Sequence, residues 1–308
     1  MFKMNVLAID GGASTAKWCV QNQEGKTLTH QITGPLSGHI FNSKTREQTE
    51  ATLRNICTTA YKVGPISKVI AGISGLDSKS DQANWVRSAI EKSLNIKDIL
   101  ISDDLFFVFL GLFAPGKGLL VYAGTGCIAY HLTKEYRVIR ANGYGYLIDD
   151  CGGGFWIGQQ ALKEWLRSME VHKPTTSLLD EKLAEKFGSR DWNIIREKVY
   201  KGGRETIASV TKEVRLAADL GDPIALQIFH EAGVEIGKLA NRLFAMTGLN
   251  TSEMHLIGGV TNCHKFLDTS LRKSLDSKIQ YRPIIANNAE IMASIVKKYN
   301  FEKLVSLT

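Results

Sequence analysis

Residues 5–20 read NVLAIDGGASTAKWCV, and this stretch predicts an apolar strand, a tight turn and a second strand. The run from Val6 to Ile9 is typical of a buried strand. Gly11 and Gly12 permit positive φ values and a close backbone approach to a ligand. Because the amide N–H groups of such a turn can bind an anion, the stretch predicts a phosphate-binding turn between two strands.

Three polar side chains accompany this turn. Asp10 suits a divalent cation or its water shell, since such cations prefer hard oxygen ligands. Ser14 and Thr15 add hydroxyl groups. An ordinary β-hairpin is the alternative interpretation. Similar features recur in the chain and favour a functional turn. An acid again follows a predicted strand at Asp104, and another glycine pair begins at Gly258.

The composition fits a globular protein of two domains. The chain has 308 residues, of which 44% are hydrophobic and 22% charged, values that are ordinary for soluble proteins. Its formal charge of +7 favours anionic partners. The Lys and Arg residues form no basic stripe, so phosphorylated small molecules are favoured over nucleic acid.

Cysteine usage and hydropathy predict a cytoplasmic protein without a membrane segment. The five cysteines show no C-x-x-C spacing, which favours free thiols in a reducing compartment. The apolar stretch before Asp10 is too short for a signal peptide. The apolar run over residues 105–114 has about half the length of a membrane span and predicts a buried helix.

The expected elements form two α/β units. The first contains a three-stranded meander over residues 5–35, helices over 45–63 and 81–94, and strands over 69–73 and 99–102. A strand–turn–strand pattern restarts at Leu119, which predicts an internal duplication. Residues 160–248 are expected to be mainly helical, and a last helix is expected over 288–300.

Asp104 is the candidate catalytic residue. It follows a predicted strand, and α/β sheets bind ligands at the carboxyl ends of their strands. Phosphoryl transfer needs a base for the incoming hydroxyl, a metal ion and amide donors for the phosphates. Asp104 could be the base, Asp10 the metal anchor, and the Gly11–Gly12 and Gly124–Gly126 turns the donors. The alternative for Asp104 is a helix N-cap.

Residues 143–158 read GYGYLIDDCGGGFWIG and combine carboxylates, aromatic rings and glycines. A sugar needs acceptors for its hydroxyl groups and an apolar surface for its C–H faces. Asp149 and Asp150 beside aromatic residues meet both needs. A structural glycine-rich loop is the alternative.

These motifs together resemble the BadF/BadG/BcrA/BcrD ATPase family, which includes N-acetylglucosamine kinases and bacterial glucosamine kinases. The resemblance covers nearly the whole chain and includes residues 217–225, AADLGDPIA. It implies two related actin-like, ribonuclease H-like α/β domains with mixed five-stranded sheets around a nucleotide cleft. The implied domains are residues 1–115 and 116–287, the second with a helical insertion, while residues 288–308 pack back on the first.

The resemblance also implies roles for individual residues. Asp104 would be the catalytic base, and Asp10 would hold Mg²⁺, through water. The ATP-binding residues would be Gly11, Gly12, Ser14, Thr15, Gly124, Thr125, Gly126, Gly258, Gly259 and Asn262. The sugar-binding residues would be His39, Ser74, Gly75, Asp104, Gly143, Tyr144, Asp149 and Asp150.

The sugar-binding motifs depart from the family pattern. The usual Asn-His pair is Gly38-His39, and Cys151 and Gly153 replace a usual glutamate and serine. The phosphate-binding motifs are largely intact. The sequence therefore predicts a working phosphate site and an altered sugar pocket.

The predicted function is transfer of the γ-phosphoryl group of ATP to a hydroxyl of N-acetylglucosamine or a related amino sugar, with Mg²⁺. One alternative is a glucosamine kinase, with Asp149 and Asp150 pairing with the ammonium group. A second is an ATPase that drives a partner through an iron–sulfur cluster, although Cys127 and Cys151 share no loop. A third is an inactive sugar sensor. Whether the chain is a homodimer is left open.

Overall fold

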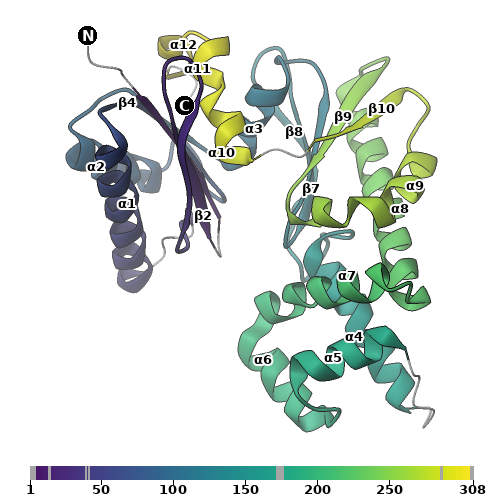
Figure 1. Ribbon diagram of the computed structural model, residues 1–308. Helices are drawn as coiled ribbons and strands as arrows, with labels where there is room; N and C mark the ends of the chain where they lie inside the picture. Colours follow the sequence, from purple (N-terminus) through teal and green to yellow (C-terminus); the bar gives the residue numbers. More distant parts are fainter. Residues whose placement is uncertain are drawn as a thin grey trace. The chain divides into compact units, whose positions relative to one another are not determined.

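Two mixed five-stranded sheets form the centre of the fold, one in each of two compact units (Figure 1). The computed structural model describes residues 5–12, 15–38, 40, 42–170, 177–284 and 287–305. The first unit comprises Met1–Pro115 and Ala286–Thr308, and the second comprises Gly116–Ile285. The two sheets confirm the predicted α/β class.

The sheet of the first unit has the order β3-β2-β1-β4-β5. Its strands are β1 (Asn5–Gly11), β2 (Ala16–Gln21), β3 (Thr27–Thr33), β4 (Ile66–Ile73) and β5 (Ile99–Ser102). β1 is antiparallel to β2 and parallel to β4, and β4 is parallel to β5. β1 and β4 are mostly buried, which explains the apolar runs over residues 6–9 and 69–73.

Helices cover both faces of this sheet. α1 (Ser43–Val63) and α2 (Asp81–Leu94) cover one face and contribute Leu53, Ile56, Val86 and Ile90 to the core. α3 (Asp104–Leu112) and α10 (Asn288–Ala293) pack together on the other face, where α10 also contacts β1 and β2 (Figure 1). The C-terminal segment is therefore part of the first unit.

The single helix expected over residues 288–300 is interrupted. α10 is followed by α11 (Ile295–Lys298), and the amide of Ser294 bonds the carbonyl of Ile291 at 3.2 Å as well as that of Glu290. Tyr299 then adopts an extended conformation and separates α11 from α12 (Phe301–Val305). The spacing of apolar residues did not reveal this interruption.

The second unit repeats the strand arrangement of the first, in the order β10-β9-β6-β7-β8. Its strands are β6 (Leu119–Ala123), β7 (Cys127–Leu132), β8 (Val138–Asn142), β9 (Ser252–Ile257) and β10 (Ile279–Pro283). As in the first unit, an antiparallel hairpin, β6–β7, is joined to a parallel strand, β9. The repeated order agrees with the predicted internal duplication.

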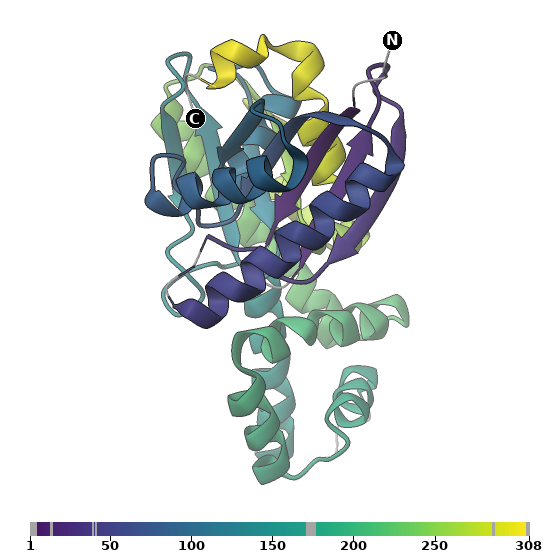
Figure 2. The same ribbon diagram turned by 90° about the vertical axis from the view of Figure 1, so that its left-hand side faces the viewer.

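The second unit carries more helices than the first. They are α4 (Gly154–Glu170), α5 (Leu178–Phe187), α6 (Trp192–Ser209), α7 (Thr211–Asp219), α8 (Pro223–Thr247), the short 3₁₀ helix η1 (Gly259–Cys263) and α9 (His264–Ser274). α8 and α9 pack closely together, while α5 and α6 lie away from the sheet of this unit (Figures 1 and 2). Residues 160–248 are thus mainly helical, as predicted.

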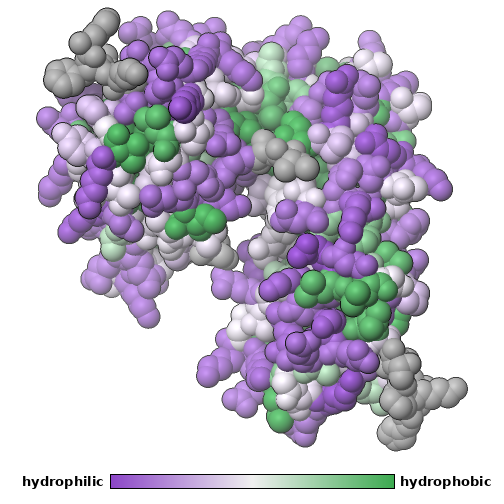
Figure 3. Space-filling model, in the orientation of Figure 1, coloured by the Kyte–Doolittle hydropathy of each residue, from purple (hydrophilic) through white to green (hydrophobic). Residues whose placement is uncertain are grey.

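Hydrophilic residues cover most of the face drawn in Figure 3, with apolar residues exposed in small groups. Within the described ranges, no helix combines the length and the apolar character that a membrane crossing requires. The apolar run over residues 105–114 instead supplies α3, whose side chains from Leu105 to Leu110 are buried.

Candidate functional site

Asp10 and Asp104 lie at adjacent strand ends of the first unit. Asp10 of β1 is paired with Gly72 of β4, and Gly72 is paired with Ser102 at the end of β5. A Cβ atom on Gly72 would lie only 2.8 Å from the Cα atom of Asp104, so this glycine allows the start of α3 to approach β4. The structure therefore brings together the predicted metal anchor and the predicted base.

Asp103, not Asp104, caps α3. Its Oδ1 atom accepts a hydrogen bond from the Phe106 N–H at 3.0 Å. The alternative interpretation of Asp104 as the N-cap is therefore wrong, because the cap lies one residue earlier. Asp104 is the first residue of α3, and its carboxylate accepts hydrogen bonds from the Asp104 and Leu105 amides.

The pKa of the Asp104 carboxyl is raised well above its usual value. Burial is the main cause, and the carboxylates of Asp10 and Asp103 add to it, while the Asp104 and Leu105 amides oppose it. A carboxylate with a raised pKa is a stronger proton acceptor than an ordinary one. A perturbed carboxyl at a strand end has the character of a functional group rather than of a surface charge.

Asn288 is a residue of this site that sequence reasoning missed. Its side chain donates a hydrogen bond to Asp10, and it begins α10, which Asn287 caps. Burial raises the pKa of Asp10 to about 6, while Lys17 and the Asn288 hydrogen bond oppose the rise. The only signal in the sequence was a predicted helix start, which does not say what the helix contacts.

Replacing Asp10 with Asn is expected to stabilise the protein above pH 7. The pKa of Asp10 is about 6 in the folded state and 3.8 for an aspartate exposed to water, so the charged form destabilises the fold. The contribution of Asp10 to the free energy of unfolding is fully present below pH 4. It is lost as the pH rises through 6, and the loss is about 3 kcal/mol at most. Urea unfolding at pH 8 should therefore show a gain of about 1–3 kcal/mol that disappears near pH 4.

The exposed Asp98 provides the matched control, because Asp98→Asn removes the same charge from the surface of the same unit. Its free energy of unfolding should change by less than about 0.5 kcal/mol at either pH. An equal effect of both substitutions would show that general charge, rather than the burial of Asp10, controls the stability.

The other predicted residues of the first unit gather beside Asp10. The Gly12 N–H donates to the Thr15 carbonyl at 3.1 Å and closes the turn after β1. The Ser74 N–H donates to the Gly11 carbonyl at 2.8 Å, which fixes the turn after β4 against the turn after β1. Ser14 and His39 lie outside the described residues.

Gly38 has a steric reason to lack the usual asparagine side chain. A Cβ atom at this position would lie 2.6 Å from the carbonyl carbon of Gly75 and 2.6 Å from the nitrogen of Leu76. Its N–H donates to the Ser74 carbonyl at 3.0 Å. The loop that contains Gly38 is thus packed directly on the turn that contains Ser74 and Gly75.

The turn from Gly124 to Gly126 joins β6 to β7 in the second unit. The Gly124 N–H donates to the Gly126 carbonyl at 2.9 Å. The start of α4 holds this turn, since Gly154 N–H donates to the Gly124 carbonyl at 2.8 Å and Phe155 N–H to the Thr125 carbonyl at 2.9 Å. Thr125 is partly exposed.

Asp150 lies directly under this turn. Its carboxylate accepts a hydrogen bond from the Cys127 N–H, and its backbone has a φ of 72°. Burial raises the pKa of Asp150, Asp149 adds to the rise, and the Cys127 N–H and Arg204 oppose it. Asp150 is only 4% exposed whereas Asp149 is half-buried, so Asp149 is the more accessible of the two carboxylates.

Gly143 and Tyr144 follow β8 near the start of β7. Gly143 has a φ of 80°, and a Cβ atom on it would approach the Ile128 side chain to 2.6 Å. Ile128 is the neighbour of Cys127, so Gly143 and Asp150 contact successive residues of β7. The Tyr144 side chain is 64% exposed and is not part of the core.

Gly258 brings a second turn of this unit against the first. β9 pairs with β6, and Gly258 follows with a φ of 101°. A Cβ atom on it would lie 2.5 Å from the Ala123 carbonyl oxygen, so only glycine fits this approach. Gly259 and Asn262 are exposed in η1. The structure thus gathers the predicted nucleotide-binding residues of the second unit at adjacent strand ends.

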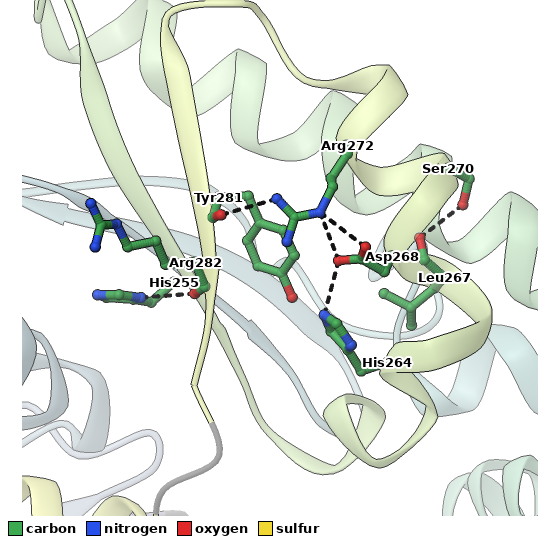
Figure 4. Close-up of polar contacts among 8 residues, drawn as sticks. All are labelled: His255, His264, Leu267, Asp268, Ser270, Arg272, Tyr281 and Arg282. Atoms are coloured by element: carbon green, nitrogen blue, oxygen red, sulfur yellow. Dashed lines mark hydrogen bonds and ion pairs between the residues drawn. The ribbon is translucent and has the colours of Figure 1, made fainter.

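A polar cluster joins α9 to β10 (Figure 4). The Asp268 carboxylate lies 3.0 Å from His264 Nε2 and accepts hydrogen bonds from Arg272 Nε at 2.9 and 3.0 Å. Arg272 also donates to the Tyr281 carbonyl at 3.2 Å and lies over the Tyr281 ring. These contacts fix the start of α9, which continues directly from η1.

The cysteines are free thiols. Cys127 is buried, and Cys151 is half-buried. Within the described part of the chain, no group of three or more His, Cys, Asp or Glu residues could hold a metal ion. The Mg²⁺ anchor predicted at Asp10 concerns a single carboxylate and stays a prediction.

Comparisons with known proteins agree with the motifs. Residues 7–296 match the model of the BadF/BadG/BcrA/BcrD ATPase family. The chain is 26% identical over 280 residues to an N-acetylmuramic acid/N-acetylglucosamine kinase of Clostridium acetobutylicum, covering 88% of this chain and 90% of that protein. It is also 26% identical over 271 residues to an N-acetyl-D-glucosamine kinase of Dictyostelium discoideum, covering 82% and 83%.

The fold has solved counterparts. A structure of a candidate N-acetylglucosamine kinase from Porphyromonas gingivalis superposes with a TM-score of 0.78 at 17% sequence identity, covering 96% of this chain and all of that one. At this identity the likeness shows the fold alone.

Proposed function

The chain belongs to the BadF/BadG/BcrA/BcrD ATPase family, and from this premise we propose that it is an ATP-dependent kinase of N-acetylglucosamine or a related N-acetylated amino sugar. The observation that carries the proposal is the placement of Asp10 and Asp104 at adjacent strand ends, with the raised pKa of Asp104. The names of the two relatives, which share N-acetylglucosamine, support the choice of sugar.

Asp104 is the proposed general base. It accepts the proton of the sugar hydroxyl as that oxygen attacks the γ-phosphoryl group, a transfer that demands correct positioning more than covalent help. Its ionised form is the reactive one, so the raised pKa makes the acid limb of the pH profile fall at a higher pH than for an ordinary aspartate.

The residues around Asp10 fit a magnesium ion. The Asp10 carboxylate offers hard oxygen atoms and is oriented by Asn288. Mg²⁺, when bound there, would neutralise phosphate charge. The Gly124–Gly126 turn is the proposed donor of amide hydrogen bonds to the phosphates, with the Thr125 hydroxyl beside it.

Sugar selection is proposed for Ser74, Gly75 and the acidic pair Asp149 and Asp150. Asp149 is the accessible member of the pair, so its carboxylate is the acceptor offered to a sugar hydroxyl. The same carboxylate would attract the ammonium group of glucosamine, and this observation makes glucosamine the second candidate substrate.

A screen of sugar-dependent ADP release tests the proposal. The purified chain is given ATP, Mg²⁺ and, in separate reactions, N-acetylglucosamine, N-acetylmuramic acid, glucosamine, glucose or no sugar. We expect the largest rate with an N-acetylated sugar. A larger rate with glucosamine favours the second candidate, and equal release without sugar favours an ATPase. Sugar binding by calorimetry with no ADP release would identify a sensor and refute the kinase proposal.

A further inference from the structure

Helix α6 is sharply kinked one residue before Arg204. Gly203 has φ 54° and ψ −140°, values that interrupt the helix and that glycine adopts readily. Thr211, just beyond α6, donates through its hydroxyl to the Gly154 carbonyl at 2.8 Å. The end of α6 is therefore fixed beside the start of α4, which itself holds the Gly124–Gly126 turn.

The kink places the Arg204 guanidinium at this turn. A Cβ atom built on Gly126 would lie 3.4 Å from Arg204 Nη2 and 2.9 Å from the Asp150 carboxyl carbon. The guanidinium carbon is 5.2 Å from the centre of the Tyr146 ring, which holds it from one side. A cation thus lies against the backbone of Gly126, although it is far from this glycine in the sequence.

One hydrogen-bond donor of Arg204 has no partner in the described part of the chain. Its Nε–H is buried and has no hydrogen-bond partner among the described residues. A buried donor without a partner costs about 1–3 kcal/mol. The planar guanidinium suits phosphoryl oxygens, because it can present parallel N–H donors to them.

We propose that Arg204 binds a phosphoryl oxygen of the nucleotide at the Gly124–Gly126 turn. The inference rests on the proposed function, which assigns the nucleotide phosphates to this turn. Asp150 cannot itself bind an anion, and Arg204 supplies the positive charge that offsets it beside the turn. The inference adds to the site a residue that none of the glycine motifs contains.

Calorimetry with ADP and with adenosine tests the inference on the full chain. Arg204→Met should weaken ADP binding about 10-fold to 100-fold and leave adenosine binding unchanged, because adenosine has no phosphate. Arg204→Lys should retain part of the ADP affinity. Arg196→Met is the matched control, since Arg196 is an exposed arginine on the same helix, and it should bind ADP like the unaltered protein.

Failure of the Arg204 inference and failure of the kinase proposal give different results. An ADP affinity of Arg204→Met within twofold of the unaltered protein overturns the inference, as does an equal loss of adenosine binding. Thermal unfolding of both variants verifies that they fold. ADP binding that depends on Arg204, in a protein that releases no ADP with any sugar, would refute the kinase proposal and leave the inference standing.

Discussion

Asp104→Asn is expected to reduce sugar-dependent ADP release by about 10²-fold to 10⁴-fold, the usual contribution of a general base. The amide has nearly the shape of the carboxylate but cannot accept the hydroxyl proton. Because the change leaves the second unit untouched, ADP affinity measured by calorimetry should stay within about twofold.

The adjacent Asp103 makes a strict control for this variant. Asp103→Asn also removes a carboxylate at the start of α3, but Asn is an equally good N-cap, so the Phe106 hydrogen bond is retained. Its rate should remain close to that of the unaltered protein. A rate of Asp104→Asn equal to that of Asp103→Asn would contradict the assignment of the base.

The positions of the strand ends were predicted well from the sequence. Asp10, Gly124 and Gly258 each follow a short apolar run, and such runs predict buried strands by composition alone. Parallel pairing of β6 with β9 then brings the last two together. Local patterns were sufficient here because the predicted site residues lie where strands end.

Asn288 and Arg204 escaped prediction for the opposite reason. Each reaches its carboxylate, Asp10 or Asp150, from a helix that is distant in the sequence. No periodicity or turn signal encodes which helix covers which strand end. The kink at Gly203 is likewise invisible to a helical pattern, since a single glycine inside a helix is usually read only as a weak helix former.

A sequence motif does not show in which direction its side chains point, and the acidic pair is an example. The sequence treated Asp149 and Asp150 alike, yet the positive φ of Asp150 turns its carboxylate toward the Cys127 N–H. Asp150 is therefore buried beneath the Gly124–Gly126 turn, and Asp149 remains accessible. Side-chain direction depended on backbone conformation that residue spacing did not specify.

Gly158→Ala is expected to destabilise the protein by about 1–3 kcal/mol or more, as overpacking does. Gly158 lies in α4, and an added Cβ would collide with the Ile207 carbonyl oxygen of α6 and lie 2.9 Å from its carbon. Helix propensity alone predicts the opposite sign, a gain of about 1 kcal/mol. Urea unfolding therefore distinguishes the two effects. A gain in stability indicates helix propensity, and a loss indicates the contact between α4 and α6.

Lys163→Ala, an exposed change in the same helix, should alter the free energy of unfolding by less than about 0.5 kcal/mol. A gain in stability for Gly158→Ala would contradict the close packing of α6 on α4. That packing also positions Arg204, because Ile207 lies about one helical turn beyond it. Folded Gly158→Ala protein should therefore bind ADP more weakly while its adenosine affinity is retained, which would connect the packing of two helices to recognition of a phosphate.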